Sequence, residues 1–279
     1  MKTPVELHGV AETLLWPLYC RATETRRPDA LLRDPLAVEV CDRIEYPFEE
    51  HFGRPSITFA LRAVTFDHQV RKFLDAHPDG TVVALGEGLD TQFWRVDNGR
   101  VRWVAVDLDE AIEVRRAFLP DTDRHRSLAR SALDLSWLDE IDPANGVLVT
   151  AQGLLMYFEE SDAQRLLAAC AERFPGGEML FDVVPGWAAE KREKKSRLRN
   201  LITLGKKKSY SLPPWKWGAT GAEMKRRGES DPNVAETRDL LFPRGRGMVF
   251  GKLQPHLDRL PFLRNKLPCY LYRRFTSDR

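Results

Sequence analysis

The sequence predicts an α/β fold built around a parallel sheet. Four short apolar runs rich in β-branched residues, at residues 81–85, 101–106, 146–151 and 178–184, are separated by helix-length segments. Strands that are apolar along their whole length are typical of parallel sheets covered on both faces, and their alternation with helices is typical of α/β domains. Hydrophobic residues make up 43% of the chain and charged residues 30%, which is ordinary for a globular protein.

The segments before the first apolar run are expected to be helical. Residues 5–45 are interpreted as helices interrupted by a turn at residues 27–29 and restarted at Asp34-Pro35. Residues 56–77 carry apolar side chains at three- and four-residue spacing, which predicts one amphipathic helix with Ser56 as its N-cap.

The later segments continue the alternation and then interrupt it. Residues 161–174 are expected to form a helix capped by Ser161, and residues 267–275 alternate in the manner of a last, half-exposed strand. Residues 185–220 break the regular pattern, and an insertion of this size after a strand is often a lid or substrate loop.

Charge is unevenly distributed along the chain, although the net charge is only +2. Residues 1–175 hold 20 Lys/Arg against 30 Asp/Glu, whereas residues 176–279 hold 23 against 11. The densest basic run, residues 191–208, is suited to an acidic substrate, a membrane surface or nucleic acid, or it forms a solvated face.

The cysteines and the N-terminus predict a cytoplasmic protein. Four cysteines lie far apart without a C-x-x-C pair, so neither a metal site nor a dense disulfide framework is expected. An acidic residue and a histidine precede the first apolar patch, which argues against a secretory signal. No apolar run approaches the ~20 residues of a membrane span, so no membrane partner is expected.

The turn after the first apolar run is the most informative segment. Gly86 and Gly88 flank Glu87, and glycines at this spacing allow a tight turn and the close approach of a ligand to the backbone. Asp107 ends the next run, where its two oxygens can accept from both hydroxyls of a ribose. Thr91 stands where a dinucleotide motif has Gly or Ala, which disfavours NAD.

A third acid, Asp134, lies within the alternating segment 131–137, which is expected to end a third strand and to place this carboxylate where it can accept from an adenine amino group. A ribose acid and an adenine acid without a phosphate cradle favour an adenosine ligand that carries no phosphate, such as S-adenosylmethionine. Either acid is also a plausible helix cap.

These motifs resemble the leucine carboxyl methyltransferase superfamily, in particular its branch that acts on small polyketide-type molecules. The likeness covers roughly residues 10–185 and rests on Tyr19 to Glu24 with Asp34-Pro35, Leu61 to Asp67, Leu85 to Thr91, the acids Asp107 and Asp134-Leu135, and Gln152 to Phe158. The resemblance implies a Rossmann-like class I methyltransferase: a mostly parallel sheet of about seven strands with an antiparallel last strand, an N-terminal helical extension and a lid insertion.

The resemblance also implies S-adenosylmethionine as the cofactor. The residues that would bind it are Arg62 at the methionyl carboxylate, Gly86, Glu87 and Gly88 in the glycine turn, Asp107 and Leu108 at the ribose, Asp134 and Leu135 at the adenine, and Gln152. Two of these depart from the family pattern, since Gln152 replaces a Glu and Glu87 replaces a small residue.

One domain is expected over residues 1–279. Its expected parts are an N-terminal helical cap at 1–55, a cofactor-binding core at 56–184, a lid insertion at 185–230, and C-terminal strands and a helix at 231–279. The oligomeric state is left open.

The expected reaction is O-methylation of an acidic small molecule. The sulfonium methyl is already electrophilic, so the enzyme mainly holds a nucleophile in line with it. A carboxylate needs no general base, whereas a phenol with a pKa of ~10 does. The six histidines lie outside the cofactor motifs and are expected at the surface or as caps, which favours a carboxylate over a phenolic hydroxyl.

Aromatic and basic side chains outside the cofactor motifs are candidates for the acceptor site. Tyr157 is expected to position the acceptor by a hydrogen bond. The candidate substrate residues are Tyr19, Arg21, Tyr210, Trp215 and Trp217.

Three other functions stay open at this stage. They are a protein C-terminal carboxyl methyltransferase, an NAD-type oxidoreductase on a similar sheet, and a nucleic-acid-binding module that uses residues 191–208. Nucleic acid is the least expected partner, because the chain carries no aromatic–basic RNA motif.

Overall fold

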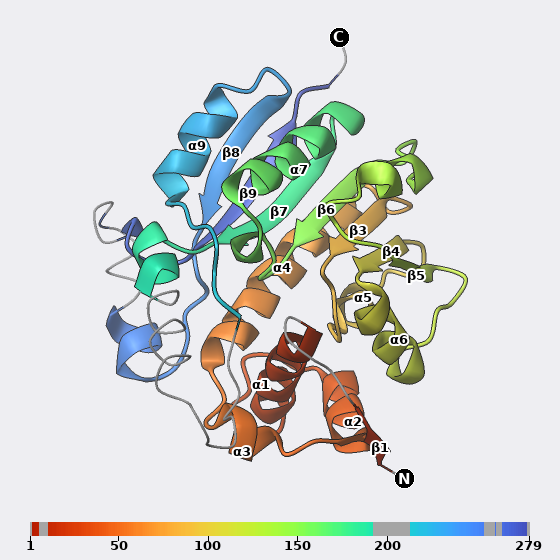
Figure 1. Cartoon of the computed structure of the whole chain (residues 1–279), viewed down its shortest axis with the longest axis vertical. Helices are drawn as coiled ribbons and strands as arrows, with labels where there is room; N and C mark the ends of the chain where they lie inside the picture. The colour runs from red at the N-terminus through yellow and green to blue at the C-terminus, as the bar shows by residue number, and fades with distance from the viewer. Residues whose placement is uncertain (1, 6–10, 192–212, 254–259, 261–263, 278–279) are drawn as a thin grey trace, which may run out of the picture.

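The computed structural model describes residues 2–5, 11–191, 213–253, 260 and 264–277, and a seven-stranded sheet forms its centre (Figure 1). The strand order is β5-β4-β3-β6-β7-β9-β8. The strands are β3 (Thr81–Leu85), β4 (Arg102–Asp107), β5 (His125–Ala129), β6 (Val147–Ala151), β7 (Glu178–Val183), β8 (Val234–Leu240) and β9 (Cys269–Phe275). Strands β3 to β7 pair in parallel, and β9 is antiparallel to both of its neighbours. The expected mostly parallel sheet with an antiparallel last strand is confirmed.

The order of the strands places a ligand crevice at β3. The chain runs outward from β3 through β4 to β5 and then returns to the other side of β3 with β6. Ligands of open α/β sheets bind beyond the carboxyl ends of the strands at such a reversal. Strands β3 and β6 are buried along their whole length, as their continuous apolar runs predict.

Two expectations about strands are wrong. Strand β9 is not half-exposed: only Arg274 of its seven residues is exposed, because β7 and β8 flank it and α9 (Gly221–Glu229) packs nearby. The alternating segment at residues 131–137 is not a strand either. It holds a turn and the start of the 3-10 helix η2 (Leu135–Glu140), and Asp134 caps that helix.

Helices cover both faces of the sheet. On one face α4 (Ile57–Ala76) and α5 (Gln92–Val96) bury Phe66, Val70 and Phe93 against the strands. On the other face α7 (Glu160–Arg173), η2 and α9 surround Trp137 and Leu166. Helix α6 (Asp109–Phe118) follows β4 and packs near β4 and β5.

The caps of two helices show how local chemistry sets helix starts. The Ser56 hydroxyl accepts from the Thr58 N–H at 3.3 Å, so the predicted cap of α4 is confirmed. For α7 the expectation is wrong: Ser161 lies inside the first turn and the N-cap is Glu159, without a side-chain cap bond. Glu160 and Asp162 place negative charge in that first turn, which favours the helix N-terminus.

The N-terminal residues form a helical cap beyond the carboxyl ends of the strands (Figure 1). Its members are β1 (Thr3–Pro4), η1 (Ala11–Leu14), α1 (Leu15–Thr25), α2 (Pro35–Arg43), β2 (Ile44–Glu45) and α3 (Phe48–Phe52). Leu15, Leu18 and Ile44 are buried in its own apolar cluster, which also includes Leu89 from the glycine turn. The cap therefore rests directly on the segment that is expected to bind a ligand.

The C-terminal part of the chain is tied back to this cap. The Arg246 guanidinium bonds to the Glu24 carboxylate of α1 and, at 2.7 Å, to the backbone oxygen of Asp29. Arg246 precedes the π-helix η4 (Gly247–Leu253). None of the described helices is both long and apolar enough to cross a membrane.

Candidate functional site

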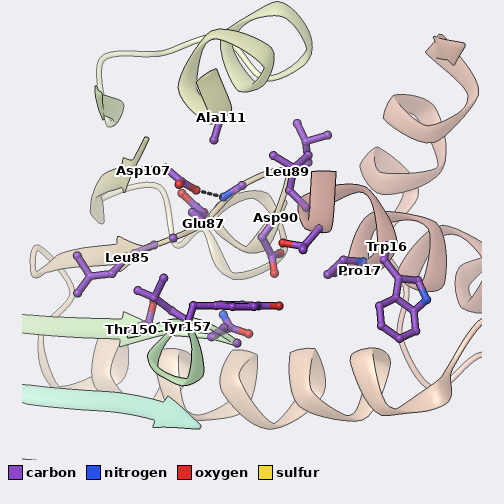
Figure 2. A pocket seen from close by; sticks show the side chains of 18 of the residues that line it. Trp16, Pro17, Leu85, Glu87, Leu89, Asp90, Asp107, Ala111, Thr150 and Tyr157 are labelled. Atoms are coloured by element: carbon purple, nitrogen blue, oxygen red, sulfur yellow. Dashed lines mark hydrogen bonds between the residues drawn. The ribbon is translucent and has the colours of Figure 1, made fainter. Parts of the chain in front are cut away.

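A pocket opens at the carboxyl ends of β3, β4 and β6 and is covered by the N-terminal cap (Figure 2). The strands and their following loops contribute Leu85, Gly86, Glu87, Gly88, Asp90, Asp107, Thr150, Gln152 and Gly153. The cap contributes Thr13, Leu14, Trp16, Pro17 and Arg21. The 3-10 helix η3 (Leu155–Tyr157) and the segment before α9 contribute Met156, Tyr157 and Trp215.

The glycine turn needs both of its glycines. Gly86 and Gly88 have φ angles of +62° and +52°, a region that side chains disfavour. A Cβ at Gly88 would lie 2.8 Å from Cβ of Leu14, and one at Gly86 would lie 2.8 Å from Cδ1 of Leu154. The turn therefore combines a left-handed backbone with close contact to the two segments that cover it.

Asp107 holds the turn from the neighbouring strand. Its Oδ2 accepts from the Gly88 N–H at 2.7 Å (Figure 2), and its Oδ1 accepts from the Leu108 N–H at 2.8 Å. Burial raises the pKa of Asp107, and the two N–H bonds offset part of that effect. Each carboxylate oxygen can accept further hydrogen bonds, so the group retains the capacity to bind a pair of hydroxyls.

Arg62 supplies positive charge at the other side of the pocket. It extends from α4 and donates to Asp182 at the end of β7, at 3.2 Å. Gly153 has a φ angle of +69°, and a Cβ there would lie 2.5 Å from Arg62 Nη1, so a side chain at this position would strain the backbone and displace the guanidinium. A guanidinium has five N–H donors, and one carboxylate contact leaves donors for another anion.

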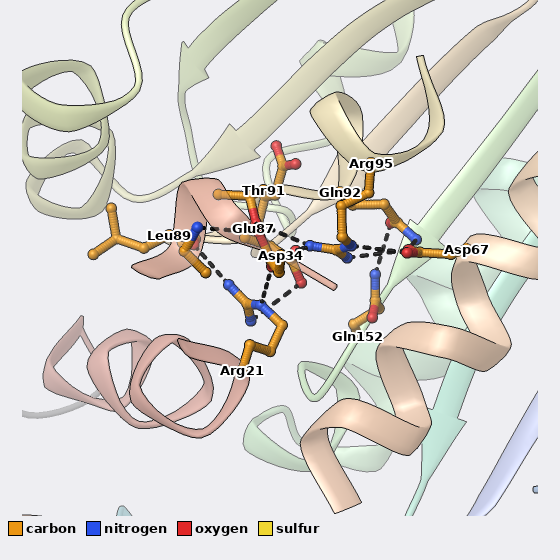
Figure 3. Close-up of polar contacts among 12 residues, drawn as sticks. Arg21, Asp34, Asp67, Glu87, Leu89, Thr91, Gln92, Arg95 and Gln152 are labelled. Atoms are coloured by element: carbon orange, nitrogen blue, oxygen red, sulfur yellow. Dashed lines mark hydrogen bonds and ion pairs between the residues drawn. The ribbon is translucent and has the colours of Figure 1, made fainter. Parts of the chain in front are cut away.

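A buried ionic network lies behind the glycine turn (Figure 3). Arg95 pairs with Asp34, Asp67 and Asp90 at 2.7–3.0 Å, and Arg21 pairs with Asp34 at 3.1 Å and Asp90 at 3.5 Å. Burial would raise the pKa of Asp90, but Arg21 and Arg95 more than offset this and hold it well below its usual range. Asp90 is therefore a persistent anion and a poor proton acceptor.

Glu87 lies on the pocket lining, but its carboxylate is bonded beneath the turn. It accepts from Trp103 Nε1 at 3.0 Å and pairs with Arg115 of α6 at 3.2 Å. Arg115 also donates to the backbone oxygens of Gly88 and Asp90, at 2.6 and 2.8 Å. The Glu87 carboxylate thus compensates the positive charge of Arg115, and Arg115 holds the glycine turn.

His125 corrects the expectation that the histidines lie at the surface or act as caps. It is fully buried, with its ring against Phe93 and Trp94 and its Nε2 2.9 Å from an Arg115 nitrogen. Sequence reasoning missed both His125 and Arg115. The signal was faint, since β5 is a polar edge strand and Arg115 is one of two adjacent arginines in α6.

The structure brings most of the sequence-predicted site residues to this pocket. Those that line it are Arg62, Gly86, Glu87, Gly88, Asp107, Leu108, Gln152 and Tyr157 for the cofactor and the acceptor, with Arg21 and Trp215 from the substrate set. Figure 2 shows the ring of Tyr157 crossing the pocket with its hydroxyl on the side of the N-terminal cap. Trp16, Pro17 and Phe59 also line the pocket and were not expected.

Four predicted residues do not line this pocket, and a fifth is outside the described part of the chain. Asp134 accepts from the Ser136 N–H and hydroxyl, and neither it nor Leu135 is among the lining residues. Tyr19 stacks on Phe48 within the cap, with ring centroids 5.5 Å apart. Trp217 is buried in the core. Tyr210 and residues 192–208 of the basic run lie outside the described part of the chain.

The donor set of the pocket fits S-adenosylmethionine, the cofactor that the sequence implies. A carboxylate suited to a ribose diol lies beside the glycine turn, and a guanidinium suited to an amino-acid carboxylate lies across the pocket. Apolar side chains, among them Leu85 and Ala111, provide contacts for an uncharged ring.

Comparisons with known proteins agree with this interpretation. Residues 15–171 match the model of the leucine carboxyl methyltransferase family. The chain is 35% identical over 193 residues to a tetracenomycin polyketide synthesis O-methyltransferase, TcmP, from Streptomyces glaucescens; the match covers 67% of this chain and 70% of the relative. It is 29% identical over 208 residues to the S-adenosyl-L-methionine-dependent methyltransferase dpfgK of Gibberella zeae. That match covers 66% of this chain and 69% of the relative.

A solved structure shares the fold. A DUF574 family protein from Streptomyces avermitilis superposes with a TM-score of 0.54 at 13% identity, covering 92% of this chain and 96% of that one. At this identity the likeness concerns the arrangement of sheet and helices.

Proposed function

This chain belongs to the leucine carboxyl methyltransferase family, and we propose that it methylates a carboxylate of an acidic small molecule. Family membership makes it an S-adenosylmethionine-dependent methyltransferase and removes the oxidoreductase and non-catalytic alternatives. The identity of the acceptor is the proposed step. It rests on one observation: each acid on the described lining of the pocket is already engaged.

The engagement of these acids leaves no evident general base. Asp90 is held ionised by Arg21 and Arg95, and the carboxylate of Glu87 pairs with Arg115 beneath the turn. Asp107 accepts two backbone N–H bonds at the ribose side. No histidine is found among the described lining residues.

A carboxylate acceptor needs no base. The cofactor supplies a methyl group on a sulfonium, so a new C–O bond forms as the C–S bond breaks and the electron pair stays on sulfur. An acceptor that is already an anion releases no proton in this step, whereas a phenol must lose one. The protein's part is to exclude water and to align the oxygen with the methyl group.

The acceptor side of the pocket is proposed to be its aromatic end. Trp16, Phe59, Tyr157 and Trp215 line the pocket outside the glycine turn. Flat side chains favour a partly aromatic acceptor by stacking. The Tyr157 hydroxyl is proposed to bond the acceptor. The name of the TcmP relative, a polyketide synthesis enzyme, is consistent with this class.

Matched acceptors test the proposal. Purified enzyme is incubated with the donor and with pairs of aromatic compounds that carry either a carboxyl group or a phenolic hydroxyl on the same ring system, and products are identified by mass spectrometry. We expect methyl esters, with a turnover that is nearly flat between about pH 6 and 9, because a carboxylic acid is ionised throughout that range. Methyl ethers formed at a rate that rises steeply with pH would contradict a carboxylate acceptor.

A further inference from the structure

Gln152 does not lie alone in the pocket; it ends a chain of buried polar side chains (Figure 3). Its Nε2 donates to Oε1 of Gln92 at 2.8 Å, and Nε2 of Gln92 donates to Oδ1 of Asp67 at 2.9 Å. Asp67 in turn accepts from Arg95 Nε at 2.8 Å and from Arg95 Nη2 at 3.0 Å. Gln92 and Asp67 are 1% and 2% exposed, so solvent does not compete for these bonds.

The polarity of this chain is set at its buried end. A carboxylate paired with a guanidinium has only acceptor atoms to offer, so Gln92 must present its NH₂ group to Asp67. The amide oxygen of Gln92 is then the atom that faces Gln152, and it can only accept. Gln152 must therefore present its own NH₂ group to Gln92. Reversing either amide would bring two acceptors together in a buried place.

This order of hydrogen bonds fixes how the Gln152 amide is oriented in the pocket. One N–H of the Gln152 amide is committed to Gln92, so the carbonyl oxygen is the acceptor that this side chain has available for a ligand. Gly153, the next residue, lies against the Arg62 guanidinium. An acceptor oxygen and an anion-binding guanidinium thus lie close together on the same wall. A ligand with an ammonium group beside a carboxylate matches that pair.

We propose that Asp67 and Gln92 are positioning residues that orient Gln152 with its oxygen toward the pocket, where it selects the protonated amine of the cofactor's methionyl part. This deepens the proposed function, because it rests on the placement of the methionyl end at Arg62 and Gln152. A fixed amide oxygen supplies the acceptor that a carboxylate would offer in any orientation.

The test compares two ligands by titration calorimetry: S-adenosylhomocysteine and its analogue in which hydrogen replaces the amino group. The wild-type protein is expected to prefer the amine-bearing ligand by about tenfold or more, as for a charge-assisted hydrogen bond. Gln92→Leu removes the hydrogen bonds that link Gln152 to Asp67 while keeping a side chain of similar size. Its preference is expected to fall to about threefold or less, because Gln152 is then free to turn.

Two further variants separate orientation from general damage. Phe93→Leu changes the neighbouring buried position of α5. Phe93 takes no part in the hydrogen bonds from Gln152 to Asp67 and does not line the pocket, so this variant should keep the full preference for the amine-bearing ligand. Gln152→Glu added to Gln92→Leu should restore it, since a carboxylate presents oxygen in either orientation. Gln92→Met replaces Gln92→Leu if circular dichroism shows that the leucine variant does not fold.

The outcomes are distinct. A folded Gln92→Leu or Gln92→Met protein that keeps the wild-type preference would overturn the positioning role. Failure of the double variant to regain the preference would overturn the claim that orientation is the cause. Wild-type protein that binds neither ligand, or binds both equally, would instead refute the placement of the methionyl end on which the inference rests.

Discussion

Asp107 and Tyr157 are proposed to serve two different tasks in the pocket. Asp107 is fixed by two backbone N–H groups beside the glycine turn, and the Tyr157 ring crosses the pocket with its hydroxyl on the side of the N-terminal cap (Figure 2). If Asp107 binds the ribose and Tyr157 the acceptor, removal of their polar groups should affect different measurements.

This division predicts opposite outcomes for two variants. Asp107→Asn replaces an acceptor oxygen and a charge, so the Kd for S-adenosylhomocysteine should rise at least about tenfold, which corresponds to ~1.4 kcal/mol. Tyr157→Phe should leave that Kd unchanged and lower kcat, because only the hydroxyl proposed to hold the acceptor is lost. Calorimetry and steady-state kinetics provide both values, and Asp109→Asn, at the exposed start of α6, is the control. Unchanged cofactor affinity in Asp107→Asn would refute the ribose role.

At the residue scale, sequence reasoning succeeded where backbone chemistry dictates a residue. Gly86 and Gly88 need positive φ angles, and Asp107 ends a strand whose apolar run is unmistakable. Sequence reasoning could not predict the direction in which an acidic side chain points. Glu87 and Asp134 are both acids near a strand end, yet Glu87 turns to Arg115 and Asp134 bonds to Ser136, because partners distant in the chain or local caps compete for them.

At the scale of single elements, continuous apolar runs predicted β3, β4, β6 and β7, and a capped amphipathic pattern predicted α4. The missed features lack a local signal. Strand β5 reads His-Arg-Ser-Leu-Ala and is held by pairing with β4 on one side only. The sequence of strand β9 alternates as in a half-exposed strand, yet the strand is buried. Its position between β7 and β8 is decided by pairing with strands that are distant in the sequence.

Helix α9 begins with a capping motif encoded in its own sequence. The Thr220 hydroxyl accepts from the Glu223 N–H at 3.2 Å, and the Thr220 N–H donates to Glu223 Oε2 at 2.6 Å, which forms a capping box. Thr220→Ala should lower the free energy of unfolding by about 1 kcal/mol. Urea denaturation measures this, with Glu229→Ala at the exposed end of the same helix as the comparison. Equal stabilities for the two variants would show that the cap does not contribute.

At the scale of the whole molecule, the buried ionic network joins three parts of the chain. Arg21 belongs to the N-terminal cap, Asp67 to α4, and Asp90 and Arg95 to the turn and helix after β3. Arg95 compensates three carboxylates at once, so one guanidinium contributes to holding the cap over the pocket. This assembly could not be predicted from the sequence, because charged residues are mostly exposed and no local pattern marks those that are buried.

Removal of Arg95 should therefore damage the fold more than removal of a surface arginine. Arg95→Leu leaves Asp34, Asp67 and Asp90 without their shared partner, and the free energy of unfolding at pH 7 should fall by about 3 kcal/mol or more. Arg100→Leu, which breaks the exposed pair with Asp79, should leave stability nearly unchanged. Arg95→Lys keeps the charge and is the variant to measure if the leucine variant does not fold.

The pH dependence identifies the cause of that loss. In the folded protein the pKa of Asp90 is lowered, so the stabilisation by the network is fully present above the unfolded value of ~3.9 and is lost as the pH falls through the folded one. In Arg95→Leu the pKa of Asp90 is lowered less. The difference in unfolding free energy between wild type and variant should therefore shrink as the pH falls from ~3.9 toward the folded pKa of Asp90 in urea titrations. A difference that stays constant over this range would mean that the loss comes from packing rather than from the charges.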